Sequence, residues 1–263
     1  MKLQRVSDKK MIERELSSDR VRALYHLGDL DDYYFKTCEW YFVSDAEKVA
    51  SVILLYKTWG TTLLPLGTPG GLRFFLEEHS DVLPNEFYSV WMPEHESVMA
   101  ELLELPGRRP MFRMAVAADT FLLCKSQREV VNLDMSHIDG IRELLRSYPA
   151  NFFEEYQLNT GYYRGIFDEG SLIAMAGVHT INRNTGVVAI GNVVTDETYR
   201  GRGLARQVTS RLVADLLVDH RLIGLNVSAE NEPAIRVYRK LGFDVRLEFF
   251  EGDCSKMKQT TDD

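Results

Sequence analysis

The chain has 263 residues, 45% of them hydrophobic and 27% charged, a composition typical of a globular protein. This length is enough for one large domain or two small ones, each with its own hydrophobic core. The formal net charge of −8 argues against a protein whose main task is binding nucleic acid, because phosphate binding needs a basic surface. We therefore expect no nucleic-acid partner, while a local basic pocket for a small anion stays open.

Cysteine content and apolar runs indicate the compartment. Cys38, Cys124 and Cys254 are too few and too widely spaced for a disulfide framework or a metal site, so we interpret them as reduced thiols and expect no metal. The N-terminus lacks the apolar stretch of a signal peptide, and the longest apolar run, residues 49–56, is far too short to span a membrane. The sequence predicts a cytoplasmic protein without a membrane partner.

The first half of the chain predicts a mixture of helices and strands. Apolar residues at helical spacing predict one or two helices within 8–27, and a Gly/Pro turn lies at 67–71. The other expected elements, in chain order, are strands at 38–43, 48–57 and 61–66, a helix at 72–79, a strand at 87–92, a helix at 94–103, and strands at 111–117 and 120–124 that form a hairpin.

The second half repeats this order of element types. A Gly-rich turn at 200–205 takes the place of the turn at 67–71. The expected elements are a helix at 136–147, a second helix at 152–156, strands at 162–167, 171–181 and 187–195, a helix after the turn to about residue 220, a strand at 223–228, a helix at 232–241 and a strand at 245–250.

The repeated order predicts a duplicated α/β fold, with two tandem domains that each have a mostly antiparallel central sheet flanked by helices. We expect the first domain at 1–125, a linker at 126–132, the second domain at 133–252 and a flexible tail at 253–263. One larger α/β domain is the alternative, since the residue identity between the halves is slight.

The Gly-rich turn Arg200-Gly201-Arg202-Gly203-Leu204-Ala205 lies between an apolar strand and an amphipathic helix. Unpaired backbone N–H groups and the helix dipole make such a turn an anion site, and glycine lets a phosphate approach the backbone. The turn lacks the ending of a P-loop and the third glycine of a dinucleotide fingerprint. It therefore indicates either a diphosphate site or a purely structural turn.

A second signature follows on the next predicted helix. Asn231 suits an N-cap, and Tyr238 follows it by seven residues, before Leu241, Gly242 and Phe243. Tyrosine at such a position is more often a core aromatic when it occurs alone. Its combination with the Gly-rich turn, in this order, favours a functional role.

These two signatures resemble those of the GNAT acyltransferase superfamily. Arg200-x-x-Gly203-x-Ala205 fits the family's R/Q-x-x-G-x-G/A loop, and the Asn231–Tyr238 pair with Leu-Gly-Phe fits its second motif. The resemblance is strong over about residues 171–250 and weaker over 133–170. The first half lacks both signatures, so it is similar to a degenerate copy, as in two-copy members of the glycine N-acyltransferase type.

The resemblance implies roles for individual residues in binding acetyl-CoA or another acyl-CoA. The backbone of Val193, Val194 and Thr195 would pair with the pantetheine arm, and Asn231 would hydrogen-bond the cofactor. Tyr238 would lie near the sulfur and act as the general acid. The pyrophosphate would be held by the turn and the start of its helix: Arg200, Gly201, Arg202, Gly203, Leu204, Ala205 and Arg206.

The general base is not evident from the sequence. Some family members carry a glutamate five residues before the asparagine, and here that position is Asn226, which cannot accept a proton at useful pH. The remaining candidates, acting through water, are Glu154, Glu155, Glu230 and His179. An acceptor with an α-amino group would be partly neutral without a base.

We therefore expect an N-acetyltransferase that acts on a primary amine of a small molecule, amino acid or peptide N-terminus. The alternatives are an amino-acid N-acyltransferase that uses a longer acyl-CoA, and a non-catalytic acyl-CoA sensor. The region 150–163, which includes the aromatic and acidic residues 152–156, is expected either to line the acceptor site or to pack as an amphipathic helix between the halves. A homodimer is compatible with the sequence.

Overall fold

The computed structural model describes residues 1–149 and 151–257. The chain folds into two compact units, one made of Met1–Phe112 and the segment that begins at Leu247, the other of Arg113–Arg246. Two strands, β7 (Arg109–Val116) and β13 (Asp244–Lys256), each run from one unit into the other. β13 continues beyond the predicted tail start at residue 253, because Asp253, Cys254 and Ser255 pair with β5 (Glu86–Trp91).

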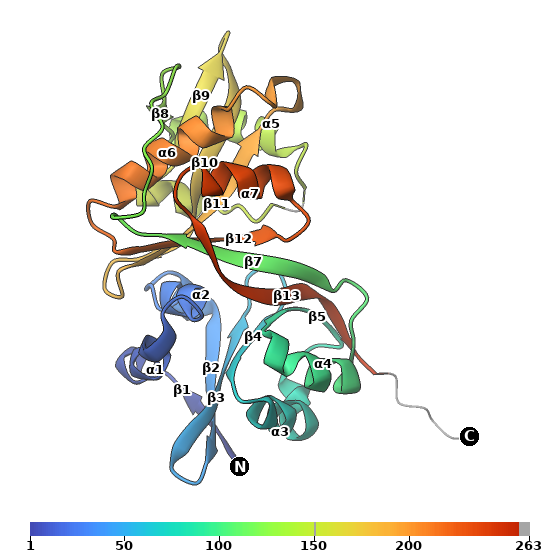
Figure 1. Ribbon diagram of the computed structural model, residues 1–263. Coiled ribbons are helices and arrows are strands. Elements are labelled where there is room, and N and C mark those ends of the chain that lie inside the picture. The colour runs from blue at the N-terminus through green and yellow to red at the C-terminus, as the bar shows by residue number, and fades with distance from the viewer. Residues whose placement is uncertain (150, 258–263) are drawn as a thin grey trace. The chain divides into compact units, whose positions relative to one another are not determined.

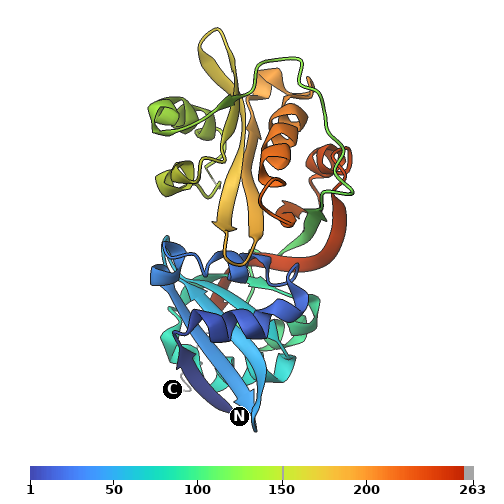
Figure 2. The same ribbon diagram turned by 90° about the vertical axis from the view of Figure 1, so that its left-hand side faces the viewer.

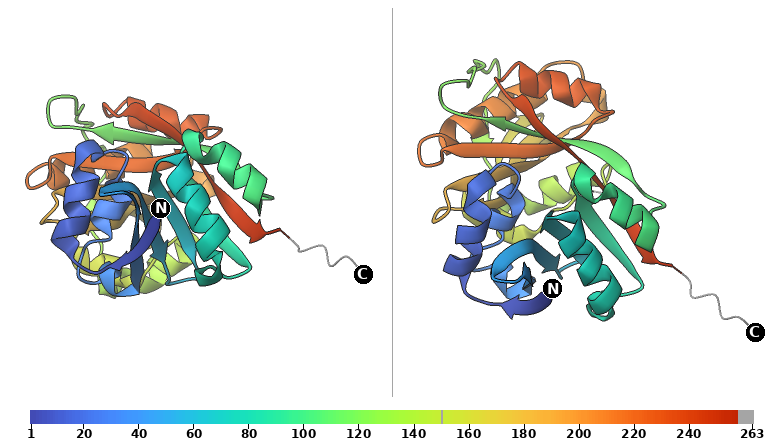
Figure 3. Two further views of the ribbon diagram at one scale, coloured as in Figure 1. Left: turned by 90° about the horizontal axis from the view of Figure 1, so that it is seen from below. Right: turned by 60° about the horizontal axis from the view of Figure 1, so that its bottom comes forward.

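The first unit is a mixed sheet with helices on both faces. Its strand order is β1-β2-β3-β4-β5-β13, antiparallel throughout except for the parallel pair β4–β5. Figure 3 shows α1 and α2 on one side of these strands and α3 and α4 on the other. The elements not yet given are β1 (Lys2–Val6), α1 (Lys9–Leu16), α2 (Leu24–Gly28), β2 (Cys38–Asp45), β3 (Lys48–Tyr56), β4 (Thr62–Gly67), α3 (Pro69–His79), α4 (Glu96–Leu102) and β6 (Leu103–Glu104).

Local sequence explains where these helices begin. The Asp8 side chain accepts hydrogen bonds from the amides of Lys10 and Met11 and so caps α1. Thr68 caps α3 in the same way, and Pro69 follows it in the first turn, where a missing N–H costs nothing. The apolar faces of α3 and α4 pack on the sheet around the buried Phe75 and Trp91.

The second unit repeats this architecture. Its strand order is β7-β12-β11-β10-β9-β8, in which the β11–β12 pair is parallel and the pairs β10–β11, β9–β10 and β8–β9 are antiparallel. Figure 2 shows α5 on one face of the strands and α6 and α7 on the other. The elements are β8 (Val131–Asn132), α5 (Ile138–Leu145), the 3-10 helix η6 (Glu155–Thr160), β9 (Arg164–Asp168), β10 (Ser171–Asn182), β11 (Val187–Thr195), α6 (Leu204–Leu216), β12 (Leu222–Ser228) and α7 (Glu232–Arg239).

The two units follow the same plan with their last strands exchanged. β13, the final strand of the chain, lies beside β5 of the first unit, whereas β7 lies beside β12 of the second. The predicted α/β class, with a mixed sheet flanked by helices, is confirmed. No helix in the part of the chain that the structure describes is long and apolar enough to cross a membrane.

Two predicted elements differ from the structure. Residues 120–124 form no strand, because their backbone bonds go elsewhere: the Leu122 amide donates to the carbonyl of Leu241 and the Cys124 amide donates to Ser210 Oγ. The expected helix at 152–156 is replaced by η6, which starts later, at Glu155. Its capping box, formed by Glu154 and Gln157, fixes that start.

Candidate functional site

β11 and β12 separate part of the way along their length. Their parallel pairing covers Val187–Ile190 of β11 and Leu222–Leu225 of β12, while both strands continue beyond it. The predicted pantetheine-binding residues Val193, Val194 and Thr195 lie in this unpaired continuation of β11. The edge of β11 that faces β12 therefore offers backbone N–H and C=O groups to an extended ligand, as the edge of a sheet does to an added strand.

The Gly-rich turn follows directly after β11 and ends at α6. Gly201 and Gly203 have φ of +77° and +73°, the left-handed region that favours glycine. A Cβ at either position would meet nothing within 4 Å, so open space lies over the turn. Gly203 is the N-cap of α6, and it supplies no side-chain cap for the amides of Leu204 and Ala205.

Arginines surround this turn. Arg200 donates to Tyr148 Oη at 2.6 Å and to Glu197 at 3.1 Å, and Arg202 lies 4.8 Å from the centroid of the Tyr199 ring. Arg206, in the first turn of α6, has its Nε buried without a hydrogen-bond partner among the described residues. Positive side chains, free helix amides and open space together suit a diphosphate.

The second pair of predicted residues lies at α7, the helix so labelled in Figure 1, with Asn231 as its N-cap and Tyr238 within it. The Asn231 side chain caps the helix, because its Oδ1 accepts a hydrogen bond from the amide of Ala234 at 3.2 Å. Seven residues of α-helix advance about 10 Å and almost two full turns, so Asn231 and Tyr238 share one face. Tyr238 is only 7% exposed and packs on Phe243, and burial raises the pKa of its phenol.

The position of the missing glutamate is filled by an amide that is already engaged. Asn226 Oδ1 accepts a hydrogen bond from Nε of the buried Arg113 at 3.0 Å. An amide held by a guanidinium cannot act as a proton acceptor.

Sequence reasoning named His179 but missed the three buried polar residues beside it, Gln157, Tyr163 and Asn192, and we call these four residues the Asn192 cluster. Asn192 has φ of +52° at a β-bulge in β11. Its Nδ2 donates to Tyr163 Oη at 2.8 Å and to Gln157 Oε1 at 3.3 Å, and Tyr163 Oη donates to the same Gln157 oxygen at 2.8 Å. The cluster thus fixes β11 at the point where it leaves β12.

Two glycines make room for this cluster. Gly177 and Gly191 are paired across β10 and β11, and a Cβ would lie 2.2 Å from the Tyr163 ring at the first position and 2.0 Å from the His179 ring at the second. Two glycines inside predicted strands were the available sequence signal, since strand glycine marks close approach. Burial lowers the pKa of His179 to about 4, which keeps its imidazole neutral near pH 7.

The remaining base candidates differ in position. Glu155 forms an ion pair with Arg142, and Glu230 is exposed before α7. Glu154 lies next to the Asn192 cluster, since its charge acts on Tyr163 and its backbone amide donates to Gln157 Oε1. The structure therefore brings only Glu154 and His179 of these four to the bulge of β11.

The corresponding turn of the first unit is closed. Thr68 Oγ1 accepts the amide of Gly71, and Ser51 Oγ donates to the carbonyl of Thr68. A Cβ on Gly71 would lie 2.3 Å from Ser51 Oγ, and a Cβ on Gly67 would lie 2.3 Å from the carbonyl oxygen of Ala50. The start of α3 is thus filled by its own chain, unlike the open start of α6.

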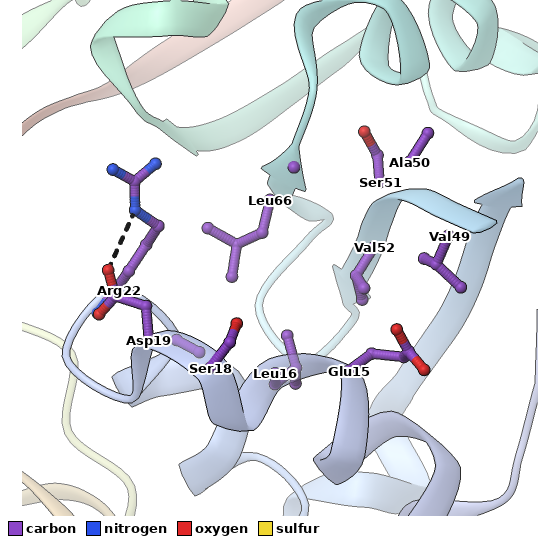
Figure 4. Close-up of a pocket in the computed structure, with 12 residues that line it drawn as sticks. Glu15, Leu16, Ser18, Asp19, Arg22, Val49, Ala50, Ser51, Val52 and Leu66 are labelled. Carbon is purple, nitrogen blue, oxygen red and sulfur yellow. Dashed lines mark hydrogen bonds and ion pairs between the residues drawn. The ribbon is translucent and has the colours of Figure 1, made fainter. Parts of the chain in front are cut away.

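A pocket of about 200 Å³ lies in the first unit, between the α1 region and strands β3 and β4 (Figure 4). Its apolar lining includes Leu16, Val52 and Leu66, and Figure 4 shows Arg22 beside Asp19 at its edge. Arg22 forms ion pairs with Asp19 and Glu94, which neutralise its charge. In the described part of the chain, no group of three His, Cys, Asp or Glu side chains is placed to hold a metal.

Two comparisons with known proteins match the second half of the chain. Residues 133–243 match the model of the acetyltransferase (GNAT) family. A curated relative, the spermine/spermidine N(1)-acetyltransferase of Bacillus subtilis, is 31% identical over 108 residues, which cover 37% of this chain and 71% of the relative.

Solved structures share the fold. A tandem GNAT protein from the clavulanic acid biosynthesis pathway is 14% identical with a TM-score of 0.60, covering 97% of this chain and 98% of its own. A GCN5-related N-acetyltransferase from Kribbella flavida is 15% identical with a TM-score of 0.61, and the match covers 92% of this chain and 96% of the other. A GNAT-family protein from Novosphingobium aromaticivorans is 19% identical with a TM-score of 0.57, and the match covers 81% of this chain and 92% of the other.

Proposed function

Because this chain belongs to the acetyltransferase (GNAT) family and is an acyltransferase, we propose that it moves the acetyl group of acetyl-CoA to a primary amine of a small molecule. One observation carries the proposal. A single unit combines the unpaired edge of β11, the open Gly-lined start of α6 and the buried Tyr238 on α7. These are the three parts that a thioester of CoA needs: a channel for its arm, a site for its diphosphate and a proton donor for its sulfur.

The open turn and the edge of β11 support a proposed set of residues that would hold acetyl-CoA. The amides at the start of α6, with Gly201 and Gly203 leaving space above them, would bind the pyrophosphate, and Arg200, Arg202 and Arg206 would add positive charge. The backbone of Val193 to Thr195 would pair with the pantetheine amides, and Asn231 Nδ2 would donate to the same arm. Acetyl-CoA supplies the activated acyl group as a thioester.

Tyr238 and the bulge of β11 would then perform the chemistry. The neutral amine nitrogen would form a bond to the acyl carbon as the carbon–sulfur bond breaks, and the Tyr238 hydroxyl would give its proton to the departing sulfur. The proton that the nitrogen loses on forming the amide would pass through water to restore the Tyr238 hydroxyl. The raised pKa of Tyr238 keeps it protonated until that step. A β11 amide, such as that of Val194, would donate to the acyl oxygen, where negative charge develops.

The acceptor would approach the bulge from the face that carries α5 and η6. Glu154 supplies negative charge beside the Asn192 cluster, which favours a cationic amine and can receive its proton through water. The relative's name points to spermine and spermidine, so a polyamine is the first acceptor to test. An amino acid or a peptide N-terminus, whose α-amine has a lower pKa, is the second.

We also propose that the first unit is a copy without a cofactor site. The filled start of α3 and the closed Thr68–Ser51 contact support this division of roles. The acyl-CoA-binding domain is then the second half, and each chain has one site.

Thiol release tests the proposed activity. The full chain is incubated with acetyl-CoA and with spermidine, an amino-acid panel or a dipeptide panel, and benzoyl-CoA replaces acetyl-CoA in a parallel series. We expect amine-dependent CoA release with acetyl-CoA and spermidine. Release only with benzoyl-CoA would favour the longer-acyl alternative, and binding without release across all amines would favour a sensor.

A further inference from the structure

The segment that joins β7 to β8, residues 117–130, runs along α6 and α7 toward the Gly-rich turn, and it is called here the connecting segment (Figure 2). Its first contact is with the end of α7, where the Leu122 amide donates to the carbonyl of Leu241. Gly242 packs so tightly on it that a Cβ would lie 1.9 Å from the carbonyl oxygen of Thr120. Further on, the Cys124 amide donates to Ser210 Oγ of α6 at 2.8 Å.

Gln207 joins this segment to the Gly-rich turn. Its side-chain Oε1 accepts from Ser126 Oγ and the Gln127 amide, both at 2.8 Å, and from the Arg128 amide at 3.4 Å. The same carboxamide points its Nε2 at the carbonyl of Gly203, 3.5 Å away. Gln207 is only 6% exposed, so these bonds are shielded from competing water.

A second connection reaches the turn from its other side. Arg128 Nη1 donates to Asp168 Oδ1 at 2.7 Å, and the Tyr199 hydroxyl lies near the same carboxylate, which raises the pKa of that hydroxyl. The guanidinium of Arg202 lies over the ring of Tyr199, 4.8 Å from the ring centroid. The chain Arg128–Asp168–Tyr199–Arg202 thus ends inside the turn that Gln207 holds at Gly203.

We propose that the connecting segment is a positioning part of the acetyl-CoA site: through Gln207 and through Arg128, it holds the turn around Gly201 and Gly203 in its binding shape. This inference rests on the proposed function. Two left-handed glycines give the turn more conformational freedom than other residues would, and ordering it during binding would reduce affinity. Hydrogen bonds that already fix the turn in the free chain reduce the conformational entropy that binding would otherwise lose.

Arg128 and Asp168 provide the test, because both are partly exposed and their loss leaves the core intact. Arg128→Gln and Asp168→Asn are compared with the wild type and with Arg221→Gln, an exposed arginine beyond the end of α6. Each is measured for amide hydrogen exchange at 201–206 without ligand, and for CoA and acetyl-CoA affinity by calorimetry. In the first two variants we expect faster exchange and about three- to tenfold weaker binding, while kcat at saturating substrate stays at the wild-type value. Arg221→Gln should match the wild type in exchange and in affinity.

A charge-swapped double variant, Arg128→Asp with Asp168→Arg, separates positioning from direct phosphate contact. Positioning predicts that the swap restores most of the affinity, whereas an arginine that touches phosphate would not be replaced by aspartate. Ser126→Ala, which removes one donor to Gln207, is expected to speed exchange at the turn in the same way.

Three results would overturn the inference. Unchanged exchange and affinity in Arg128→Gln and Asp168→Asn would show that the segment does not hold the turn. Weakened binding that the swap fails to restore would assign Arg128 to the ligand itself. If the wild-type chain binds no CoA, the proposed function is wrong and this inference is wrong with it. The first two results, in contrast, refute the inference alone, because they require a wild-type chain that binds CoA.

Discussion

At the scale of single residues, Tyr238 has the most specific proposed role. Its phenol is buried on α7 and makes no hydrogen bond within the described residues, so it is available to a ligand atom. We expect Tyr238→Phe to lower kcat about a hundredfold, because general acid assistance is lost, while the Kd for acetyl-CoA changes by less than about twofold. Steady-state kinetics and calorimetry measure the two effects separately.

The matched control is Tyr162→Phe, which removes a hydroxyl from a tyrosine that packs on His220 and takes no part in the proposed site. Its kcat should equal that of the wild type. Equal turnover in Tyr238→Phe and the control would remove Tyr238 from the mechanism.

His179 gives a prediction for the dependence of stability on pH. Its pKa in the folded chain is about 4, lowered by burial, so between pH 6.5 and 4 the unfolded chain binds a proton that the folded chain does not. Stability is therefore fully present above pH 6.5 and falls as the pH drops toward 4, by up to about 3 kcal/mol. Burial lowers the pKa of His95 and His220 as well, and these act in the same direction.

Urea unfolding at pH 7.5 and pH 5 measures this effect. His179→Gln cannot take up the proton, so the loss of unfolding free energy between the two pH values should be smaller in the variant than in the wild type. An equal loss in both proteins would mean that His179 is not protected from protonation by the fold.

The residues of the site differ in how far the sequence predicts them. Gly203, Asn231 and Tyr238 lie within local motifs, so their place at helix starts and on one helix face could be read from spacing alone. The Asn192 cluster joins η6, the residue before β9, and strands β10 and β11. Its contacts depend on the register of the sheet and on a bulge, which no local pattern specifies.

At the scale of elements, the start of α6 carries the binding proposal. Gly203→Ala places a methyl group in the open space over the turn and forces alanine to φ of +73°. The conformational part of this change costs about 1 kcal/mol of stability. We expect, in addition, that CoA binding weakens about tenfold or more, because the methyl group lies where the phosphate would approach.

Gly186→Ala is the matched control for this variant. Gly186 lies outside the proposed site, has φ of +68°, and likewise has open space where a Cβ would be. The two variants should lose similar stability in denaturant unfolding, while only Gly203→Ala loses affinity. Equal affinity in both would exclude this turn as the diphosphate site.

Most elements were predictable because their patterns are strong and local. The exceptions have physical reasons. β1, β6 and β8 were missed, and β6 and β8 each have only two residues, too few for a period to appear. Residues 120–124 have the composition of a strand, but their amides find partners on α6 and at the end of α7, so no strand forms.

At the scale of the whole chain, the structure shows a duplication with exchanged last strands. β13 pairs with β5, and β7 lies beside β12, so neither half of the sequence supplies all the strands of its own sheet. A division at residues 126–132 was a natural reading of the sequence. Strand exchange depends on which strands pair across a long sequence separation, and the order of elements along the chain does not specify that pairing.

Because the fold is duplicated, the number of acyl-CoA molecules bound by each chain tests whether one or both units have a cofactor site. The two turns occupy equivalent places in the element order, but the start of α3 is filled by Thr68 and Ser51, whereas the start of α6 is open. The proposed account therefore requires one acyl-CoA for each chain of 263 residues.

Titration calorimetry of the full chain with acetyl-CoA, beside the Gly203→Ala variant, tests this claim most directly. We predict saturable binding of one acetyl-CoA per chain in the wild type, with affinity reduced about tenfold or more in the variant. Absence of binding, a second equivalent site, or wild-type affinity in Gly203→Ala would contradict the assignment of acetyl-CoA to the turn between β11 and α6.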